Sequence, residues 1–132
     1  MSPDDQISPH FKRGEFACKN GCGFMDPAAE LVASLELLRE IVNQPIIIDG
    51  ACRCQKHNAE VGGCQHSQHV LGTAADIRVV GMPAKELYEY AVKVPHFNGF
   101  GVSQGEYIHV DTRDYPAKWS YNAEGKEIPW AV

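Results

Sequence analysis

Residues 67–76 read Ser67-Gln68-His69-Val70-Leu71-Gly72-Thr73-Ala74-Ala75-Asp76, and the fold has to be built around this stretch. It places the imidazole of His69 and the carboxylate of Asp76 seven residues apart, with only small or apolar residues between them. In a continuous strand, an odd separation sends two side chains to opposite faces. Gly72 can bend the backbone, since glycine adopts conformations that other residues avoid. We therefore predict a bend at Gly72 that brings His69 and Asp76 together.

A second stretch, Glu106-Tyr107-Ile108-His109-Val110-Asp111, supplies another imidazole. Two imidazoles and one carboxylate are a ligand set that catalytic zinc uses, with the fourth position left for water. We therefore predict a zinc site made by His69, Asp76 and His109. Asp111 is two residues beyond His109, so a strand puts both on one face, where the carboxylate can hold the other imidazole nitrogen.

Two further residues are predicted to act on a substrate. Glu106 is three residues before His109, so a continuous strand would point it away from the metal. Gly105 beside it indicates a turn that can rotate Glu106 inward, where it is the candidate general base for water at the metal. Arg53 follows the apolar run 46–48 at the start of a loop, where its guanidinium can hold a carboxylate by two hydrogen bonds.

The motifs S-x-H-x-x-G-x-A-x-D and E-x-x-H-x-D, in this order, resemble those of the zinc D-Ala-D-Ala carboxypeptidase family. That family belongs to the LAS group of peptidoglycan metallopeptidases, together with L-Ala-D-Glu endopeptidases, lysostaphin-type enzymes and hedgehog signalling domains. Residues 49–53 resemble the family's S-G-Y-R segment and residues 58–63 its N-x-x-V-G-G segment, so the likeness covers most of residues 10–120. Departures from the pattern are Asp49, Cys52, Cys64 and His66, and a thiol near the metal would make the site sensitive to oxidation.

The resemblance implies an α+β fold of the LAS type, with a central antiparallel sheet and helices packed on one side. It implies zinc as the cofactor and peptidoglycan stem peptides as the substrate. The residues it assigns are His69, Asp76 and His109 as ligands, Glu106 as the catalytic acid/base, Arg53 as the group that binds a substrate carboxylate or developing oxyanion, and Ser67 and Asp111 as supports for the ligands.

Three function classes are compatible with these residues. The first is a zinc peptidase that cuts stem peptides, either as a D-Ala-D-Ala carboxypeptidase or as an L-Ala-D-Glu endopeptidase. The second is a hedgehog-like zinc-binding module without catalysis, which the presence of Glu106 disfavours. The third is a D-Ala-D-Ala dipeptidase, which would cleave free dipeptide and leave stem peptides intact.

The charge and the apolar pattern of this 132-residue chain limit the classes of partner that it is expected to bind. Its net charge of −5 and the absence of a basic block argue against nucleic acid as a partner. The longest apolar runs have only strand length, so no transmembrane segment is expected. The first residues, Met1-Ser2-Pro3-Asp4-Asp5, lack the pattern of a signal peptide. We expect a monomer that acts on the cell wall in the periplasm or envelope, reached by a route the sequence does not show, or during phage lysis.

The remaining sequence predicts the scaffold of one catalytic domain over residues 1–132. Residues 1–9, with two prolines and polar residues, are predicted to form a loose N-terminal leader. A helix is expected from Pro27 to Val42, with Asp26 as its N-cap, and another from residue 83 to 94. Strands are expected at 45–49, 75–80, 97–102 and 107–112. A further strand at 119–121 would place Trp119 and Tyr121 in the core or at the sheet edge, with a wall of the substrate cleft as the alternative.

The five cysteines, Cys18, Cys22, Cys52, Cys54 and Cys64, cannot all pair within one chain because their number is odd. Without a signal peptide, reduced thiols are the simplest interpretation. Cys18 and Cys22 leave two alternatives open: they could form a disulfide, or they could supply half of a structural metal site.

Overall fold

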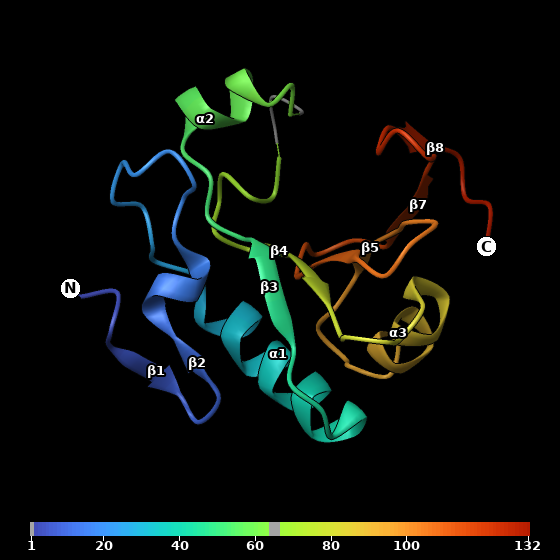
Figure 1. The fold of residues 1–132 in the computed structure, drawn as a ribbon, viewed down its shortest axis with the longest axis horizontal. Helices are drawn as coiled ribbons and strands as arrows, with labels where there is room; N and C mark the ends of the chain where they lie inside the picture. Colours follow the sequence, from blue (N-terminus) through green and yellow to red (C-terminus); the bar gives the residue numbers. More distant parts are fainter. Residues whose placement is uncertain (1, 64–66) are drawn as a thin grey trace.

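A six-stranded sheet organises the protein, as seen in a computed structural model that describes residues 2–63 and 67–132 (Figure 1). Cys64 and His66 lie outside the described residues. The elements in chain order are β1 Gln6–Ser8, β2 Phe11–Lys12, a 3₁₀ turn Arg13–Phe16, α1 Ala29–Val42, β3 Ile47–Gly50, α2 Gln55–Glu60, β4 Ala74–Arg78, α3 Ala84–Ala91, β5 Gly99–Val102, β6 Ile108–Asp111, β7 Ala117–Tyr121 and β8 Glu127–Ile128. The predicted α+β class is therefore confirmed.

The sheet has the strand order β3-β4-β6-β5-β7-β8. Every neighbouring pair is antiparallel except β5 and β7, which run parallel. The reason lies in the register: Asp111 at the end of β6 pairs with Gly99 at the start of β5. The short connection 112–116 therefore delivers the chain to the end of the sheet where β5 begins, and Ala117 pairs with Gly99 from the outer side.

The alternation of side chains divides the sheet into an apolar face and a polar face. Ile77 of β4 and Ile108 and Val110 of β6 are fully buried on the apolar face. They belong to one core cluster with residues of α1 and α3, namely Leu31, Leu35, Leu38 and Leu87. The opposite face of the same strands carries Asp76 and His109. Packing of the apolar face on the core therefore fixes the two strands that carry these predicted ligands.

Two local predictions were wrong. The leader was expected to be loose, but Gln6–Ser8 forms β1, and the Ser8 hydroxyl donates a hydrogen bond to Glu36 of α1 at 2.5 Å. Asp26 was expected to cap α1, but the helix begins at Ala29 after Ala28, without a side-chain cap. Asp26 lies two residues before the N-cap position and pairs with Arg13 at 3.4 Å.

None of the helices in the described ranges combines the length and the apolar character that a membrane span requires.

Candidate metal centre

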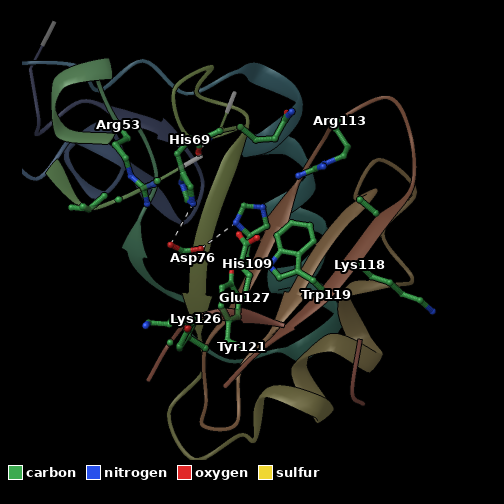
Figure 2. A pocket seen from close by; sticks show the side chains of 18 of the residues that line it. Arg53, His69, Asp76, His109, Arg113, Lys118, Trp119, Tyr121, Lys126 and Glu127 are labelled. Atoms are coloured by element: carbon green, nitrogen blue, oxygen red, sulfur yellow. Dashed lines mark hydrogen bonds and ion pairs between the residues drawn. The ribbon is translucent and has the colours of Figure 1, made fainter. Parts of the chain in front are cut away.

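The centre of the polar face is a pair of residues on adjacent strands, Asp76 of β4 and His109 of β6. They lie directly opposite each other in the antiparallel register, so both side chains point to the same side of the sheet. Gly72 adopts φ +73°, and the turn that it closes carries His69 back over the start of β4. His69 Nε2 lies 3.4 Å from Asp76 Oδ2, and His109 Nδ1 lies 3.3 Å from Asp76 Oδ1 (Figure 2). The structure thus brings the three predicted ligands together.

The second nitrogen of each imidazole has a partner that can only accept a hydrogen bond. His69 Nδ1 lies 2.8 Å from the carbonyl oxygen of Ala51, and His109 Nε2 lies 2.7 Å from Asp111 Oδ2. When each ring is neutral, its proton therefore belongs on this nitrogen, which leaves His69 Nε2 and His109 Nδ1 with lone pairs that face Asp76.

This donor set fits a zinc ion. The three ligand atoms lie within 4.8 Å of one another. Tetrahedral zinc with bonds of about 2.0–2.1 Å to nitrogen and oxygen separates its ligand atoms by about 3.3 Å, which agrees with the spacing across Asp76. Both imidazoles are buried, with 5% of each residue exposed, so their positions are fixed by packing.

The charges around His109 shift the pKa values of the centre. Burial alone would lower the pKa of His109, but the hydrogen bonds and charges of Asp111 and Asp76 outweigh it and raise the pKa to about 9. Burial would raise the pKa of Asp76, yet the two imidazoles hold it well below its usual range. A cation bound between these groups would compete with the proton of His109, because metal ligands bind in their deprotonated form.

Asp111 is fully buried and connects His109 to Arg113. Arg113 donates to it from Nε at 2.8 Å and from Nη2 at 2.7 Å, and its backbone N–H donates at 3.1 Å. Gly99 leaves the space for this network, since a Cβ at that position would collide with both carboxylate oxygens. Sequence analysis missed Arg113, although it lies two residues beyond Asp111 and the alternation of a strand would have put both on one face.

A cleft of about 1170 Å³ lies over the metal centre. Its wall includes Trp119 and Tyr121 of β7, so the alternative to core or edge packing is the one that the structure shows for these two residues. Gly101 of β5 lies beneath them, and a Cβ there would come within 2.6 Å of both rings. The C-terminal hairpin adds Lys126 and Glu127 to the lining of the cleft (Figure 2). No sequence pattern beyond their charge indicated that these two residues belong to the site.

Arg53 also lines the cleft. Its backbone N–H donates to the carbonyl oxygen of His69 at 3.1 Å, so the guanidinium and the first ligand are joined through the main chain. Its Nη1 donates to Oδ1 of the buried Asn58 at 3.0 Å, which orients the planar group. In the described part of the chain, no carboxylate pairs with Arg53, so its remaining donors face the cleft without a charged partner.

Of the two remaining predicted site residues, Ser67 lies in the cleft lining and Glu106 does not. Ser67 lines the cleft, and its hydroxyl accepts a hydrogen bond from the backbone N–H of His69 at 3.2 Å. Glu106 is half-buried in the bend before β6 and is not among the residues that line the cleft, whereas the neighbouring Tyr107 is. The carbonyl of Gly105 accepts a hydrogen bond from Ala84 at the start of α3, which holds this bend towards the core side of the sheet.

Comparison with known proteins matches residues 9–111 to a family model described as peptidase M15. The match spans most of the chain and includes all three residues of the metal centre and Arg53. No curated protein matches the chain.

Proposed function

Because this chain belongs to the peptidase M15 family, we propose that it is a zinc metallopeptidase that hydrolyses a peptide bond in peptidoglycan stem peptides. One observation carries the proposal: the side chains of His69, Asp76 and His109 converge at the base of an open cleft, with their ligand atoms within 4.8 Å of one another, a set that zinc can bind. Their buried positions and fixed tautomers favour a preformed site.

A zinc ion held there would lower the pKa of a water molecule that it binds and would polarise the carbonyl of the scissile bond. The carbonyl of Ala51 and the carboxylate of Asp111 keep the two imidazoles in the tautomers that ligate. Glu106 would accept a proton from the attacking water and pass it to the leaving amine. Because Glu106 is not among the residues that line the cleft, this role requires the bend at 104–106 to move its carboxylate towards the metal site.

The charges of the cleft favour a peptide that carries carboxylates. Its lining residues include four cations, Arg53, Arg113, Lys118 and Lys126, and three carboxylates, Asp76, Glu124 and Glu127. Among the cations, Arg53 has no carboxylate partner in the described part of the chain, so it is the group available to a substrate carboxylate. Arg53 would hold a free substrate carboxylate near the scissile bond through two N–H donors. The size of the cleft suits an extended stem peptide better than a free dipeptide, which supports an endopeptidase or a carboxypeptidase rather than a dipeptidase.

The Glu106 proposal is tested by digesting purified muropeptides and reading the products by mass spectrometry. Glu106→Gln should lower kcat by about 10²- to 10⁴-fold, because it removes the proton acceptor, while the zinc content stays at the parental level. The matched control is Glu127→Gln, which changes the same kind of side chain at the rim of the cleft and should alter kcat only a few-fold. Parental activity in Glu106→Gln, or a large loss confined to Glu127→Gln, would show that the base is misassigned.

The same digestion separates the function classes. Products cut between L-Ala and D-Glu identify an endopeptidase, and loss of the terminal D-Ala identifies a carboxypeptidase. Cleavage of free D-Ala-D-Ala alone would identify a dipeptidase. Zinc bound at this centre without turnover of any muropeptide would refute the catalytic proposal in favour of a binding module.

Arg53→Lys should raise KM for muropeptides roughly tenfold with a small change in kcat. Lysine keeps the charge but loses one of two parallel hydrogen bonds to a carboxylate, which is worth about 1.5 kcal/mol. Arg78→Lys is the control, since Arg78 pairs with Asp49 outside the cleft at 3.1 Å and should leave both constants unchanged. Steady-state kinetics that show equal effects of the two substitutions would exclude Arg53 as the carboxylate anchor.

A further inference from the structure

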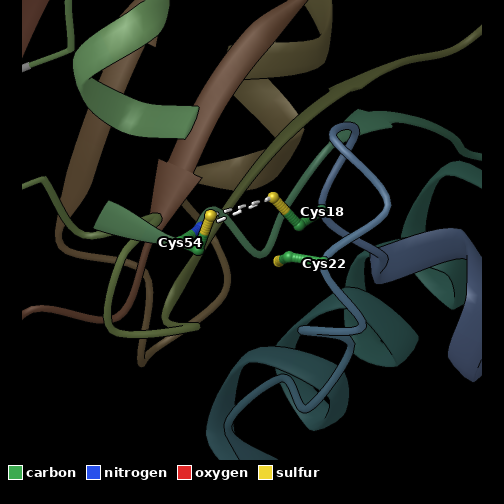
Figure 3. Close-up of side chains that lie close together, drawn as sticks. All are labelled: Cys18, Cys22 and Cys54. Carbon is green, nitrogen blue, oxygen red and sulfur yellow. Dashed lines mark hydrogen bonds between the residues drawn. The ribbon is translucent and has the colours of Figure 1, made fainter. Parts of the chain in front are cut away.

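Three cysteines meet on the far side of the segment that carries Arg53. Cys18 and Cys22 belong to the loop after the 3₁₀ turn, and Cys54 directly precedes α2 (Figure 3). Their sulfur atoms lie within 4.8 Å of one another, and Cys18 Sγ and Cys54 Sγ are 3.9 Å apart. We refer to Cys18, Cys22 and Cys54 as the cysteine cluster. It uses three of the four described cysteines, all of which have free thiols.

The loop from Cys18 to Phe24 is shaped to bring its two thiols together. Gly21 and Gly23 flank Cys22 with φ values of +74° and +92°, which side chains rarely tolerate. The backbone N–H of Cys18 donates to the carbonyl of Phe24 at 2.8 Å, which closes the loop at its base. This C-x-x-x-C spacing lies within the range of structural zinc sites.

Hydrogen-bond donors surround the sulfur atoms. Cys54 Sγ accepts from the backbone N–H of His57 at 3.4 Å and from the side-chain amide of Asn20 at 3.2 Å. Cys18 Sγ accepts from the backbone N–H of Cys54 at 3.5 Å. The bond from His57, helped by that from Asn20, lowers the pKa of the Cys54 thiol to about 7. These donors favour the thiolate of Cys54, the form in which cysteine binds metals, whereas the neighbouring sulfur atoms raise the pKa of the Cys22 thiol.

We propose that the cysteine cluster is a second metal site, which binds Zn²⁺ through three thiolates and is distinct from the His69–Asp76–His109 centre. Zinc with bonds of about 2.3 Å to sulfur separates its sulfur ligands by about 3.8 Å, close to the spacing of Cys18 and Cys54. Cys22 is exposed, so the fourth position faces solvent and is open to water. Binding replaces each thiol proton by a zinc–sulfur bond and releases the protons to solvent.

This site would brace the segment Ala51–Cys54, which serves the first centre. Ala51 accepts the hydrogen bond from His69, and Arg53 lies one residue before Cys54. Without the metal, a backbone bond from Cys52 to Phe16 at 3.0 Å already ties this segment to the N-terminal part of the chain. A metal bridge from the loop to Cys54 would add a second tie, so the site acts as a structural clamp.

The test uses Co²⁺, because thiolate ligands give it an intense near-ultraviolet charge-transfer absorption that imidazole and carboxylate ligands do not give. The full-length protein, reduced with a phosphine, should develop this absorption and bind two equivalents of Co²⁺ or Zn²⁺. His69→Ala should keep the thiolate absorption, so the outcome does not depend on the proposed peptidase centre. Cys22→Ser, a change at an exposed position that the fold tolerates, should weaken binding at the cluster by about a hundredfold or more.

Cys52→Ala is the matched control. Cys52 is buried beside the cluster, and burial raises the pKa of its thiol to about 11, so it should contribute nothing to metal binding. The proposal is overturned if the parent shows no thiolate absorption at stoichiometric Co²⁺, or if Cys22→Ser and Cys54→Ser bind as tightly as Cys52→Ala. A thermal melt gives an independent readout: Zn²⁺ should raise the Tm of His69→Ala, and this rise should vanish when Cys54→Ser is added.

Discussion

Replacing His109 with alanine should reduce the hydrolysis of muropeptides to the background rate. In the proposed zinc site His109 is one of three ligands, and its Nδ1 lies 3.3 Å from Asp76 Oδ1 at the base of the cleft. Changes in residues that merely support a ligand cost metal sites about 10- to 100-fold, so the loss of a ligand should exceed a hundredfold. Zinc content at this centre, measured by equilibrium dialysis, should fall together with the activity.

His96→Ala is the control for His109→Ala, because His96 is an exposed histidine away from the cleft. His69→Ala provides a second ligand variant from a different element, and the two ligand variants should lose zinc to a similar extent. The His109 side chain also lies between the carboxylates of Asp76 and Asp111, so its removal brings a change in packing. Circular dichroism should therefore verify that each variant is folded before its activity is compared. A folded His109→Ala protein that retains parental zinc and activity would refute the assignment of the ligands.

Asp111→Asn should weaken zinc binding by about 10- to 100-fold and also destabilise the fold. The carboxylate accepts hydrogen bonds from His109 Nε2 and from Arg113, and all of these partners are donors. An asparagine amide would direct its NH₂ group at one of them, which favours the His109 tautomer with the proton on Nδ1, where zinc must bind. Loss of the buried charge also weakens the hydrogen bonds from Arg113, which is partly exposed to the cleft, at a cost of about 1–3 kcal/mol in the free energy of unfolding.

Asp114→Asn is the matched control for Asp111→Asn, since it removes the same charge three residues later at an exposed position. Urea denaturation with and without zinc separates the two effects: the stability loss should persist without zinc, and the affinity loss should appear only in the dialysis. Equal unfolding midpoints for the two variants would contradict the structural role of Asp111. Equal zinc affinity would contradict its control of the tautomer.

Much of the fold followed from local patterns. The helix that ends at Val42, the strand around Asp76 and the hairpin before and after Gly105 lie close to where the sequence placed them. Where prediction failed, the residues concerned contact a segment elsewhere in the chain. Asp26 pairs with Arg13 instead of capping α1, and the leader is held by Glu36 of a helix far along the chain.

Part of the candidate metal centre was also predictable, because two of its features are local. One is the bend at Gly72, and the other is the alternation that puts His109 and Asp111 on one face. The meeting of Asp76 with His109 depends on the pairing of β4 with β6, which no local pattern encodes. The inward rotation of Glu106 depended on how the turn packs, and Gly105 is instead held by the start of α3. Backbone contacts of this kind leave no mark in the residue pattern around Glu106.

By itself, then, the sequence determined which residues share a face and where the backbone can bend, because side-chain direction in a strand alternates with a period of two. Tertiary structure decided what surrounds the metal centre. Trp119 reaches the cleft only because β7 runs parallel to β5 over Gly101, and Cys54 joins Cys18 only because two loops 36 residues apart meet. Such pairings depend on strand order and loop packing over the whole chain, so no local pattern encodes them.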